Sequence, residues 1–497
     1  MRWPITSLVR KLAPAIQLFM VLLALWQSAR IVFRPDRLDD LRHADALFAA
    51  GRYHDARAAY AAVLMRAPRL ATAVLRLGIV YAVRNERAAA DEQLAYALSV
   101  GLGQGDYDLA RLYQGWLAAE AGQHEQAARY WATIGERSAW LPVRHVLQAE
   151  SLLALGDYAG AEAAYRDATP ADLPPEWHGL ASLRLALLRA SSDPAAALAE
   201  LQRAPALAAS EPSGAVYGAP LVPAAETDAR LLAAALRAPP EQRHLLLGQL
   251  YLRARLYGLA EAQFAAVAPG SPSAIAAAAY AAYTRWSAGD RPEGLRRLEA
   301  LVAAHPSERR ARGLLALAYL SSRDPAGAQT QLAIVRAQAP RAPETHLAWA
   351  QWYVVQHDYV AAAAEYRRAH DDAAPEQRGP YALALARFHL DIALDRCETG
   401  LPAAEEAARI LLNDPRAWTT LASARFGCGD PAGARAAAEQ ALQHDPASAE
   451  ASYYLGRALA ALGDRPAARL ALISAADLAP RSAWRERAES QIATLGL

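Results

Sequence analysis

Small residues recur along this chain at a nearly fixed interval, each followed by bulkier apolar positions. These small residues, which we call the rung residues, are Ala56, Ala90, Ala127, Ala161, Ala197, Ala260, Gly294, Ala328, Ala362, Ala403, Ala434 and Ala468. Six of the eleven steps between them span 34 residues, and the others span 37, 36, 63, 41 and 31 residues. A fixed period of this length is typical of a repeat protein, in which each unit buries its apolar face against its neighbours.

The positions around each rung residue predict two helices per unit. Four positions after it there is usually a bulky residue, namely Tyr60, Leu94, Trp131, Tyr165, Leu201, Phe264, Leu298, Leu332, Tyr366 or Leu472. Five positions before it there is often a glycine, and twelve positions after it a proline; these are Gly51, Gly122, Gly156, Gly289, Gly429 and Gly463, and Pro68, Pro306, Pro340, Pro415, Pro446 and Pro480. Glycine ends one helix with a left-handed backbone, and proline closes the second helix or begins the next. The rung residue then lies where the two helices cross closely.

This arrangement resembles the tetratricopeptide repeat family, whose first helix carries a small residue twelve positions before the rung and an aromatic residue or leucine nine before it. The matching pairs are Gly78 and Tyr81, Gly248 and Tyr251, Ala316 and Tyr319, Ala350 and Tyr353, and Gly456 and Leu459, while Trp418, Leu421 and Ala422 match the opening of another unit. Apart from one gap, the resemblance covers residues 37–497. It implies an all-α solenoid of about twelve helix-turn-helix units, wound into a right-handed superhelix. Another kind of helical-hairpin array is the alternative.

Composition agrees with an all-α fold. Hydrophobic residues make up 54% of the 497 residues, and alanine, the best helix former, is the commonest of them. Alternating runs of β-branched and aromatic residues, which indicate strands, are absent.

The 63-residue step divides the array. Residues 204–223 hold four prolines and two glycines, which predicts a loop or linker. We expect a short helix over residues 224–237. The resulting division is an N-terminal array (37–203), a linker (204–240), a C-terminal array (241–480) and a capping helix (481–497) with Trp484, Ile492 and Leu495 on its apolar side. Three roles stay open for the linker: a hinge, a self-inhibitory loop in the groove, or a surface insertion without consequence.

Residues 1–36 predict a membrane anchor. The apolar run over residues 12–33 is 22 residues long, enough to cross about 30 Å of hydrocarbon and enter the lipid bilayer. A cleaved signal peptide and a soluble first helix are the alternatives, although the residues around Gln27 make a poor cleavage site. Arg2, Arg10 and Lys11 precede the run, which favours a single-pass protein with its repeats outside the cytoplasm. The arginines that follow it, Arg30, Arg34, Arg37 and Arg42, favour the reverse orientation.

Charge content bears on whether the chain binds nucleic acid, and cysteine content on whether it forms a disulfide. The chain has 52 basic and 51 acidic residues, so we expect no nucleic-acid partner, which would need a clustered positive surface. Its two cysteines, Cys397 and Cys428, both stand six positions before a rung residue. Equivalent positions in stacked units should lie about 10 Å apart, too far for a disulfide. We therefore expect two free thiols, with a disulfide between them as the alternative.

Catalytic signatures are missing from the sequence. It has no HExxH, no phosphate-binding loop, no GxSxG and no CxxC motif, and its twelve histidines show no ligand spacing. We therefore expect no enzyme, no cofactor and no metal site.

The groove is then the candidate site. In the tetratricopeptide repeat family the first helix of each unit lines the concave wall, and the resemblance assigns these wall positions here to Trp116, Glu120, Glu150, Gln249, Arg253, Tyr283, Trp286, Gln351, Ser423, Phe426, Tyr453 and Arg457. Aromatic residues and isolated arginines suit an extended peptide or a partner helix. Several of the aromatics have a second interpretation as packing between units.

Two functions follow as hypotheses. The first is a membrane-anchored scaffold of bacterial type that binds protein partners in its groove and recruits them to a membrane assembly. The second is an accessory factor for the export or assembly of a cell-surface polysaccharide, which rests on analogy alone.

Overall fold

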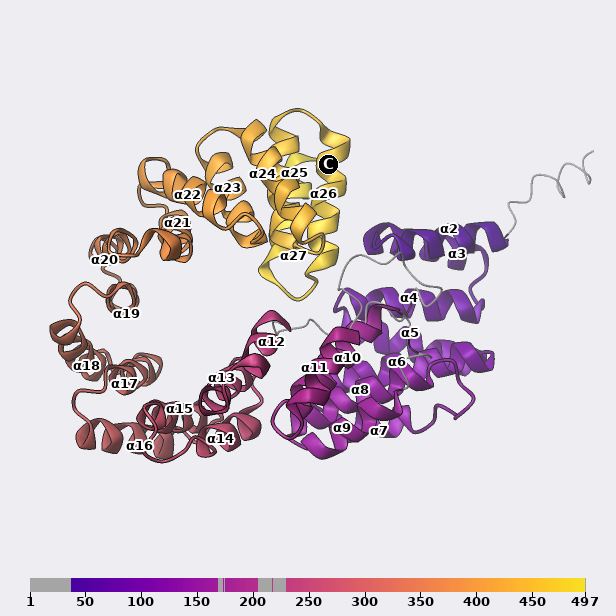
Figure 1. Ribbon diagram of the computed structural model, residues 1–497. Coiled ribbons are helices and arrows are strands. Elements are labelled where there is room, and N and C mark those ends of the chain that lie inside the picture. Colours follow the sequence, from indigo (N-terminus) through magenta and orange to yellow (C-terminus); the bar gives the residue numbers. More distant parts are fainter. Residues whose placement is uncertain (1–36, 169–172, 174, 204–216, 218–228, 497) are drawn as a thin grey trace, which may run out of the picture.

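The residues that the structure describes form twelve helix pairs, arranged in one curved array (Figure 1). This computed structural model describes residues 37–168, 173, 175–203, 217 and 229–496. Within them every regular element is helical, so the expected all-α solenoid of about twelve units is confirmed.

Five pairs precede the linker and seven follow it. The first five are α2 (Arg37–Ala49) with α3 (Tyr53–Arg66), α4 (Ala71–Val83) with α5 (Arg87–Val100), α6 (Gln104–Glu120) with α7 (His124–Trp131), α8 (Leu141–Leu155) with α9 (Tyr158–Asp167), and α10 (Pro175–Arg189) with α11 (Pro194–Arg203). Helix α12 (Ala229–Arg237) follows alone. The remaining pairs are α13 (Pro240–Arg253) with α14 (Tyr257–Ala265), α15 (Ala274–Ser287) with α16 (Arg291–Ala304), α17 (Arg309–Ser321) with α18 (Pro325–Gln338), α19 (Pro343–Val355) with α20 (Tyr359–Asp371), α21 (Arg378–Ile392) with α22 (Leu401–Ile410), α23 (Pro415–Gly427) with α24 (Pro431–His444), and α25 (Ala449–Ala461) with α26 (Arg465–Leu478). Helix α27 (Ala483–Leu495) ends the chain.

The rung residues lie at the helix crossings, as predicted. Eleven of the twelve are alanines exposed by 6% or less, and Gly294 is also buried. A Cβ atom on Gly294 would come within 2.5 Å of the Trp286 backbone nitrogen. At that crossing the two helices are therefore too close for any side chain.

The turn before ten of the twelve rung residues is left-handed. All six glycines predicted there have positive φ, from 69° at Gly51 to 111° at Gly289. At six rungs another residue stands five positions before, and four of these residues share the backbone: Asn85, Arg255, Arg323 and His357 have φ of 59–60°. Ser192 and Glu398, in the irregular units, do not have positive φ. The repeat geometry therefore imposes a left-handed backbone even on non-glycine residues, for which this conformation is unfavourable in free energy.

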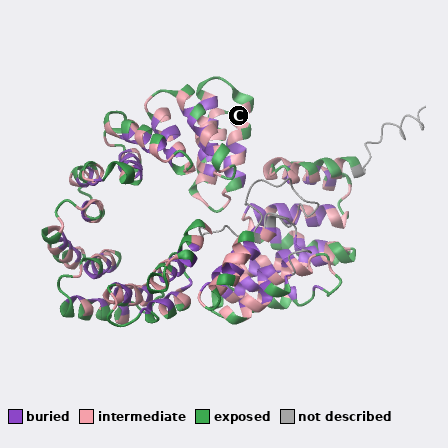
Figure 2. Ribbon diagram, viewed as in Figure 1, coloured by how far each residue is buried: buried purple, intermediate pink, exposed green. Residues whose placement is uncertain are grey.

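The first helix of each pair forms the inner side of the curve in the second half. Figure 1 shows α13, α15, α17, α19 and α21 on the inside of the arc, with α14, α16, α18, α20 and α22 outside. Buried residues form a thin band between these layers (Figure 2).

The two halves differ in how their cores connect. One continuous apolar cluster runs from Ala44 to Ala277, and it includes Leu232 and Leu236 of α12. From Ala279 onward the described buried residues form separate, smaller clusters, the last of them around Tyr453 and Ala488. The first half therefore shares one core with α13, α14 and the start of α15, and the rest of the second half is an arc of separate, smaller cores.

The linker is described only in part. Of residues 204–228, the structure describes Tyr217 alone, so the predicted loop and the first five residues of the predicted helix 224–237 otherwise lie outside the described residues. Helix α12 begins at Ala229 and packs against α11 and α13. The division into arrays 37–203 and 241–480 stays a proposal.

The predicted free thiols are wrong, because Cys397 and Cys428 form a disulfide with a Cα–Cα distance of 5.6 Å. The prediction treated the two residues as equivalent positions of regular units. Residues Arg396–Gly400 instead form a π-helical turn, η4, and Ala393 and Asp395 have φ of 63° and 45°. This irregular connection carries Cys397 to Cys428 at the end of α23.

The predicted single-pass membrane location, with repeats outside the cytoplasm, is contradicted. Across the residues that the structure describes, no helix has both the length and the apolar character needed to cross a bilayer. The predicted span, residues 12–33, lies outside the described residues.

Replacing Gly115 tests the close crossing of paired helices. A Cβ atom there would lie 2.1 Å from Nε1 of the buried Trp131, so Gly115→Ala should destabilise the chain by about 1–3 kcal/mol through overpacking. Gly105→Ala is the matched control in the same helix, because a Cβ at Gly105 meets nothing within 4 Å. Urea unfolding followed by circular dichroism measures both. Equal stabilities of the two variants would refute the close crossing.

Candidate partner-binding surfaces

The predicted wall residues all lie on the first helices of their units. They come from α6, α8, α13, α15, α19, α23 and α25. Glu120, Arg253 and Gln351 are exposed, while Trp286 and Tyr453 are buried, each with 8% exposure. The remaining seven are partly buried. Availability to a partner therefore differs along the wall.

A cavity of about 620 Å³ opens on the inner wall between α17 and α19. Its apolar lining includes Leu314, Leu317 and Leu347, and Gln351 lies among the polar lining residues. Leu317 and Gln351 each stand eleven positions before a rung residue, Ala328 and Ala362. Gln351 is thus the predicted residue that the structure places in a cavity. The sequence analysis missed Leu317 because a leucine in a helical repeat is indistinguishable from a core residue.

A second group of predicted residues meets on α23 and α25. The Arg457 guanidinium carbon lies 4.2 Å from the centre of the Phe426 ring and 5.6 Å from that of Tyr453. Tyr453 packs on Trp484 of α27, with ring centres 5.4 Å apart. Phe426 and Arg457 therefore form a cation–π pair on the wall, whereas Tyr453 serves the core of the last unit.

Other predicted residues interact mainly within the chain. Tyr283 and Trp286 stack on each other, with ring centres 5.5 Å apart. Glu150 accepts hydrogen bonds from Arg184 at 2.9 and 3.2 Å and another from Tyr165. A partner that used Glu150 would have to compete with this bidentate arginine.

Trp116 and Glu120 contact the far end of the chain. Arg481, just before α27, lies with its guanidinium carbon 5.1 Å from the Trp116 ring centre and forms an ion pair with Glu120. Two positions predicted to receive a partner are thus engaged by the chain's own C-terminal segment.

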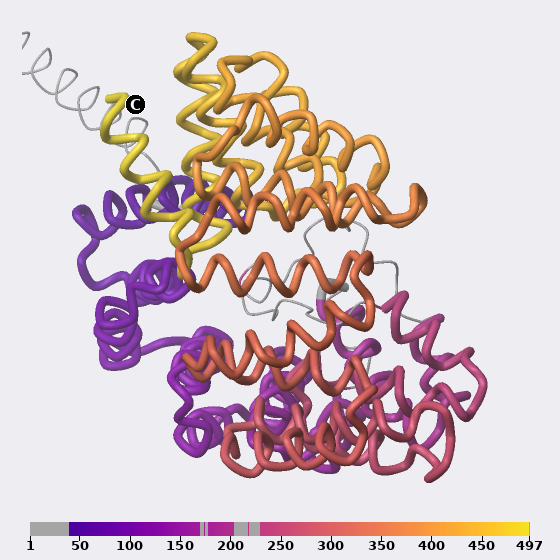
Figure 3. Tube along the Cα trace, turned by 90° about the vertical axis from the view of Figure 1, so that its left-hand side faces the viewer, coloured from indigo at the N-terminus to yellow at the C-terminus, as the bar shows by residue number. Residues whose placement is uncertain are grey.

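These contacts belong to a junction that closes the array into a ring. Both Figure 1 and Figure 3 show α26 and α27 beside the first helices of the chain. Arg84, at the end of α4, is paired with Asp477 of α26 at 2.6 Å, and their side chains are 3% and 1% exposed. The His54 backbone N–H also donates to Asp477, at 3.1 Å. We call this pair and its neighbours, Glu86, Arg485 and Glu489, the junction network.

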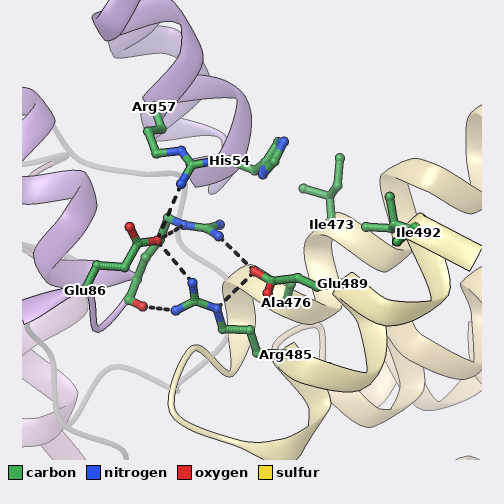
Figure 4. Close-up of a pocket in the computed structure, with 10 residues that line it drawn as sticks. His54, Arg57, Glu86, Ile473, Ala476, Arg485, Glu489 and Ile492 are labelled. Atoms are coloured by element: carbon green, nitrogen blue, oxygen red, sulfur yellow. Dashed lines mark hydrogen bonds and ion pairs between the residues drawn. The ribbon is translucent and has the colours of Figure 1, made fainter. Parts of the chain in front are cut away.

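The junction network alternates charges from both ends of the chain (Figure 4). Glu489 pairs with Arg84 at 3.1 Å, and Arg485 pairs with Glu86 at 3.1 Å and Glu489 at 3.0 Å. Arg485 also donates to the Arg84 backbone carbonyl. Except for Asp477, the network's members line a pocket of about 450 Å³, together with apolar residues of the C-terminal helices such as Ile473 and Ile492. Nothing in the sequence could reveal it, because Arg84 and Asp477 are 393 positions apart.

Burial dominates the titration of Asp477. It raises the pKa of this carboxyl to about 6, although the His54 N–H and Arg84 act to lower it. Burial, followed by the nearby Arg84, lowers the pKa of the neighbouring His54. The junction therefore holds a carboxyl group that titrates near pH 6, beside an imidazole that burial keeps neutral to lower pH than usual.

Comparison with known proteins supports the repeat assignment. Family models described as tetratricopeptide repeats match residues 41–107, 281–340 and 426–489. No curated protein matches the chain.

Several solved structures resemble parts of the chain. Among them are pilF of Pseudomonas aeruginosa (18% identity, 45% of this chain and 100% of that chain, TM-score 0.37) and yeast Tom70 (13% identity, 79% and 96%, TM-score 0.36). Another is YrrB, described as a TPR protein with an unusual peptide-binding site (18% identity, 39% and 97%, TM-score 0.33).

Removing Arg84 tests the ring closure. Arg84→Met leaves Asp477 as a buried, unpaired carboxylate at neutral pH, which should cost about 3–5 kcal/mol. Urea unfolding measures the loss, and small-angle X-ray scattering should report a larger radius of gyration as the ends separate. Arg296→Met is the control, because Arg296 is 69% exposed in its pair with Glu293 and should change stability little. Unchanged stability and dimensions in Arg84→Met would contradict the closed ring.

The raised pKa of Asp477 predicts a particular pH dependence. The folded chain holds a proton on Asp477 that the unfolded chain has released, so this contribution to stability is largest below about pH 4. It is lost as the pH rises through about 6. His54 acts oppositely, since its lowered pKa makes folding less favourable as the pH falls.

A comparison with Asp477→Asn isolates the carboxyl, because both proteins keep His54. Between pH 4.5 and 6 the stability of the wild type relative to Asp477→Asn should fall by up to about 1.4 kcal/mol per pH unit. Urea unfolding across this range measures the difference. A difference that grows with pH would show instead that the Arg84 ion pair outweighs the burial of Asp477.

Proposed function

This chain belongs to the tetratricopeptide repeat proteins, and we propose that it is a scaffold that binds a protein partner on the inner wall of residues 241–480. The partner presents a helix or an extended segment to the first helices of these units. Family membership supports the general role of a protein-interaction scaffold. The location on the second half rests on the observations below.

The cavity between α17 and α19 is the observation that carries the proposal. Its floor is apolar, with Leu314, Leu332 and Val335, while its edge carries Arg310 and Glu344. An apolar floor with a polar rim suits one buried anchor side chain of a partner, flanked by polar contacts that orient the segment. A side chain that enters the cavity would be held by two neighbouring units at once.

The Phe426–Arg457 pair supports a second contact along the same wall. An aromatic ring with a guanidinium at 4.2 Å from its centre offers both apolar area and hydrogen-bond donors. Aromatic and arginine side chains supply much of the binding free energy at protein interfaces. A segment that contacts α19 and α25 together would follow the curve of the array.

Two parts of the earlier hypotheses are not retained. We no longer propose recruitment to a membrane, because the single-pass membrane location on which it rested is contradicted. The polysaccharide accessory role has no observation in its favour among the described residues, so we do not propose it.

Site-specific photo-crosslinking in the native host tests the proposed wall. A photoreactive amino acid at Gln351 should capture a protein partner, because Gln351 is exposed and lines the cavity. The same group at Val360 is the matched control: Val360 is 74% exposed on α20, the outer helix of the same unit (Figure 1). Leu317→Arg, which fills the cavity, should reduce the Gln351 adduct about tenfold. Equal adducts at both positions, or none at Gln351, would argue against the wall as the binding surface.

A further inference from the structure

Tyr217, the one described residue of segment 204–228, inserts between helices of the first three units. Its hydroxyl donates to Asp45 Oδ1 at 2.5 Å and lies 2.9 Å from the Tyr60 hydroxyl. Tyr60 donates to the same carboxylate oxygen at 2.6 Å. Both phenol groups thus converge on one partly buried carboxylate.

The ring and backbone of Tyr217 are held as specifically as its hydroxyl. The guanidinium carbon of Arg76 lies 3.8 Å from the centre of the Tyr217 ring, and the Phe48 ring centre lies 4.7 Å away on a tilted plane. The fully buried Tyr113 donates to the Tyr217 carbonyl oxygen at 2.7 Å. We call Asp45, Phe48, Tyr60, Arg76 and Tyr113 the tyrosine socket.

The tyrosine socket uses the wall positions of the repeat. Asp45 stands eleven positions before the rung residue Ala56, the same register as Gln351 before Ala362. Arg76 and Tyr113 stand fourteen positions before Ala90 and Ala127, the register of Leu314 and Ala348 in the C-terminal cavity. Tyr217 therefore occupies, in the first half, the positions that form an open cavity in the second half.

Each part of the tyrosine socket recognises a different part of a tyrosine residue. The carboxylate of Asp45 selects a hydroxyl donor, and burial raises the pKa of Tyr217, so that this hydroxyl keeps its proton. The guanidinium of Arg76 faces the π system. Two of its nitrogens, Nε and Nη1, are buried and have no hydrogen-bond partner among the described residues. A phenylalanine would fill the same space but leave Asp45 without one of its two donors.

We propose that the tyrosine socket is a binding site for a tyrosine side chain, that Tyr217 occupies it as an internal ligand, and that a protein partner presenting a tyrosine in an extended segment binds there by displacing Tyr217. The site is separate from the wall of residues 241–480. Its partner can therefore be sought independently of the proposed scaffold function.

Because Tyr217 competes for the tyrosine socket, it lowers the apparent affinity of the socket for a tyrosine on another protein. A tethered side chain competes at an effective concentration that reaches the millimolar range for short linkers. The apparent affinity of a partner falls by the fraction of molecules whose socket is open. If one molecule in ten is open, removing Tyr217 raises the apparent affinity about tenfold.

Peptide binding to the full chain tests the proposal. The probe is a fluorescein-labelled peptide with the sequence of residues 213–221, Ser-Gly-Ala-Val-Tyr-Gly-Ala-Pro-Leu, titrated by fluorescence anisotropy. Tyr217→Ala should bind it at least tenfold more tightly than the wild type. Tyr96→Ala is the matched control, because Tyr96 is 42% exposed on α5 and should bind the peptide as the wild type does.

Two further comparisons test the chemistry of the site. A peptide with phenylalanine in place of tyrosine should bind Tyr217→Ala about tenfold more weakly, and so should the tyrosine peptide with the double variant Asp45→Asn, Tyr217→Ala. Leu317→Arg, which blocks the C-terminal cavity, should leave peptide binding unchanged. This last result separates the tyrosine socket from the proposed wall, so that either can fail alone.

Several outcomes would overturn the proposal. They are no binding to folded Tyr217→Ala, equal affinities for Tyr217→Ala and the wild type, or equal affinities for the tyrosine and phenylalanine peptides. If Tyr217→Ala does not fold, Tyr217→Phe decides: it keeps the internal ring but removes its hydroxyl, so it should bind the tyrosine peptide more tightly than the wild type. An unchanged affinity in Tyr217→Phe would then show that Tyr217 only packs the linker against the array.

Discussion

The close crossing of two helices at each rung residue is the contact on which the structure depends. An alanine or glycine there lets the two helix backbones approach closely, as at Gly294, where a Cβ atom would lie 2.5 Å from the Trp286 backbone nitrogen. The small residue on the facing helix is in turn covered by a bulky side chain, as Gly115 is by Trp131. The crossing fixes the relation of the two helices within a unit, and repetition of the unit then fixes the curve. Because each unit buries its apolar face only against its neighbours, the inner wall is left free to carry residues that are not needed for folding.

An array built this way has two ends, and here the ends meet. The contact is made largely by charges: Arg84 and Asp477 at its centre are almost fully buried, and Glu86, Arg485 and Glu489 surround them. A buried ion pair contributes little net stability compared with apolar packing, but a mismatched one is costly. The junction network is therefore better suited to selecting one closed geometry than to stabilising the fold. Arg481 extends the contact onto Trp116 and Glu120, so closure also occupies part of the wall.

The repeat could be predicted from sequence because its determinants are local. The rung residues, the left-handed turns and the prolines are all set by spacing within one unit, and the structure confirms them down to Arg323 and His357, which adopt the glycine backbone. The disulfide was not favoured from sequence, because regular units would hold Cys397 and Cys428 about one helix diameter apart, and the π-helical turn at Arg396–Gly400 breaks that regularity. The junction network and the tyrosine socket could not be predicted from the sequence for a different reason. Their members lie hundreds or tens of positions apart, and no periodic pattern marks Arg84, Asp477 or Tyr217.

The same wall positions are occupied by the chain's own side chains in the first half but line an open cavity in the second half, and this difference follows from how the two halves pack. In the first half, over a continuous core, the positions around Asp45 and Arg76 hold Tyr217, and Trp116 holds Arg481. In the second half, over separate thin cores, the equivalent positions at Leu317 and Gln351 line a cavity. A side chain of the chain itself is always present at high effective concentration. A partner therefore meets less competition on the second half, whereas on the first half it must offer more than Tyr217 already provides.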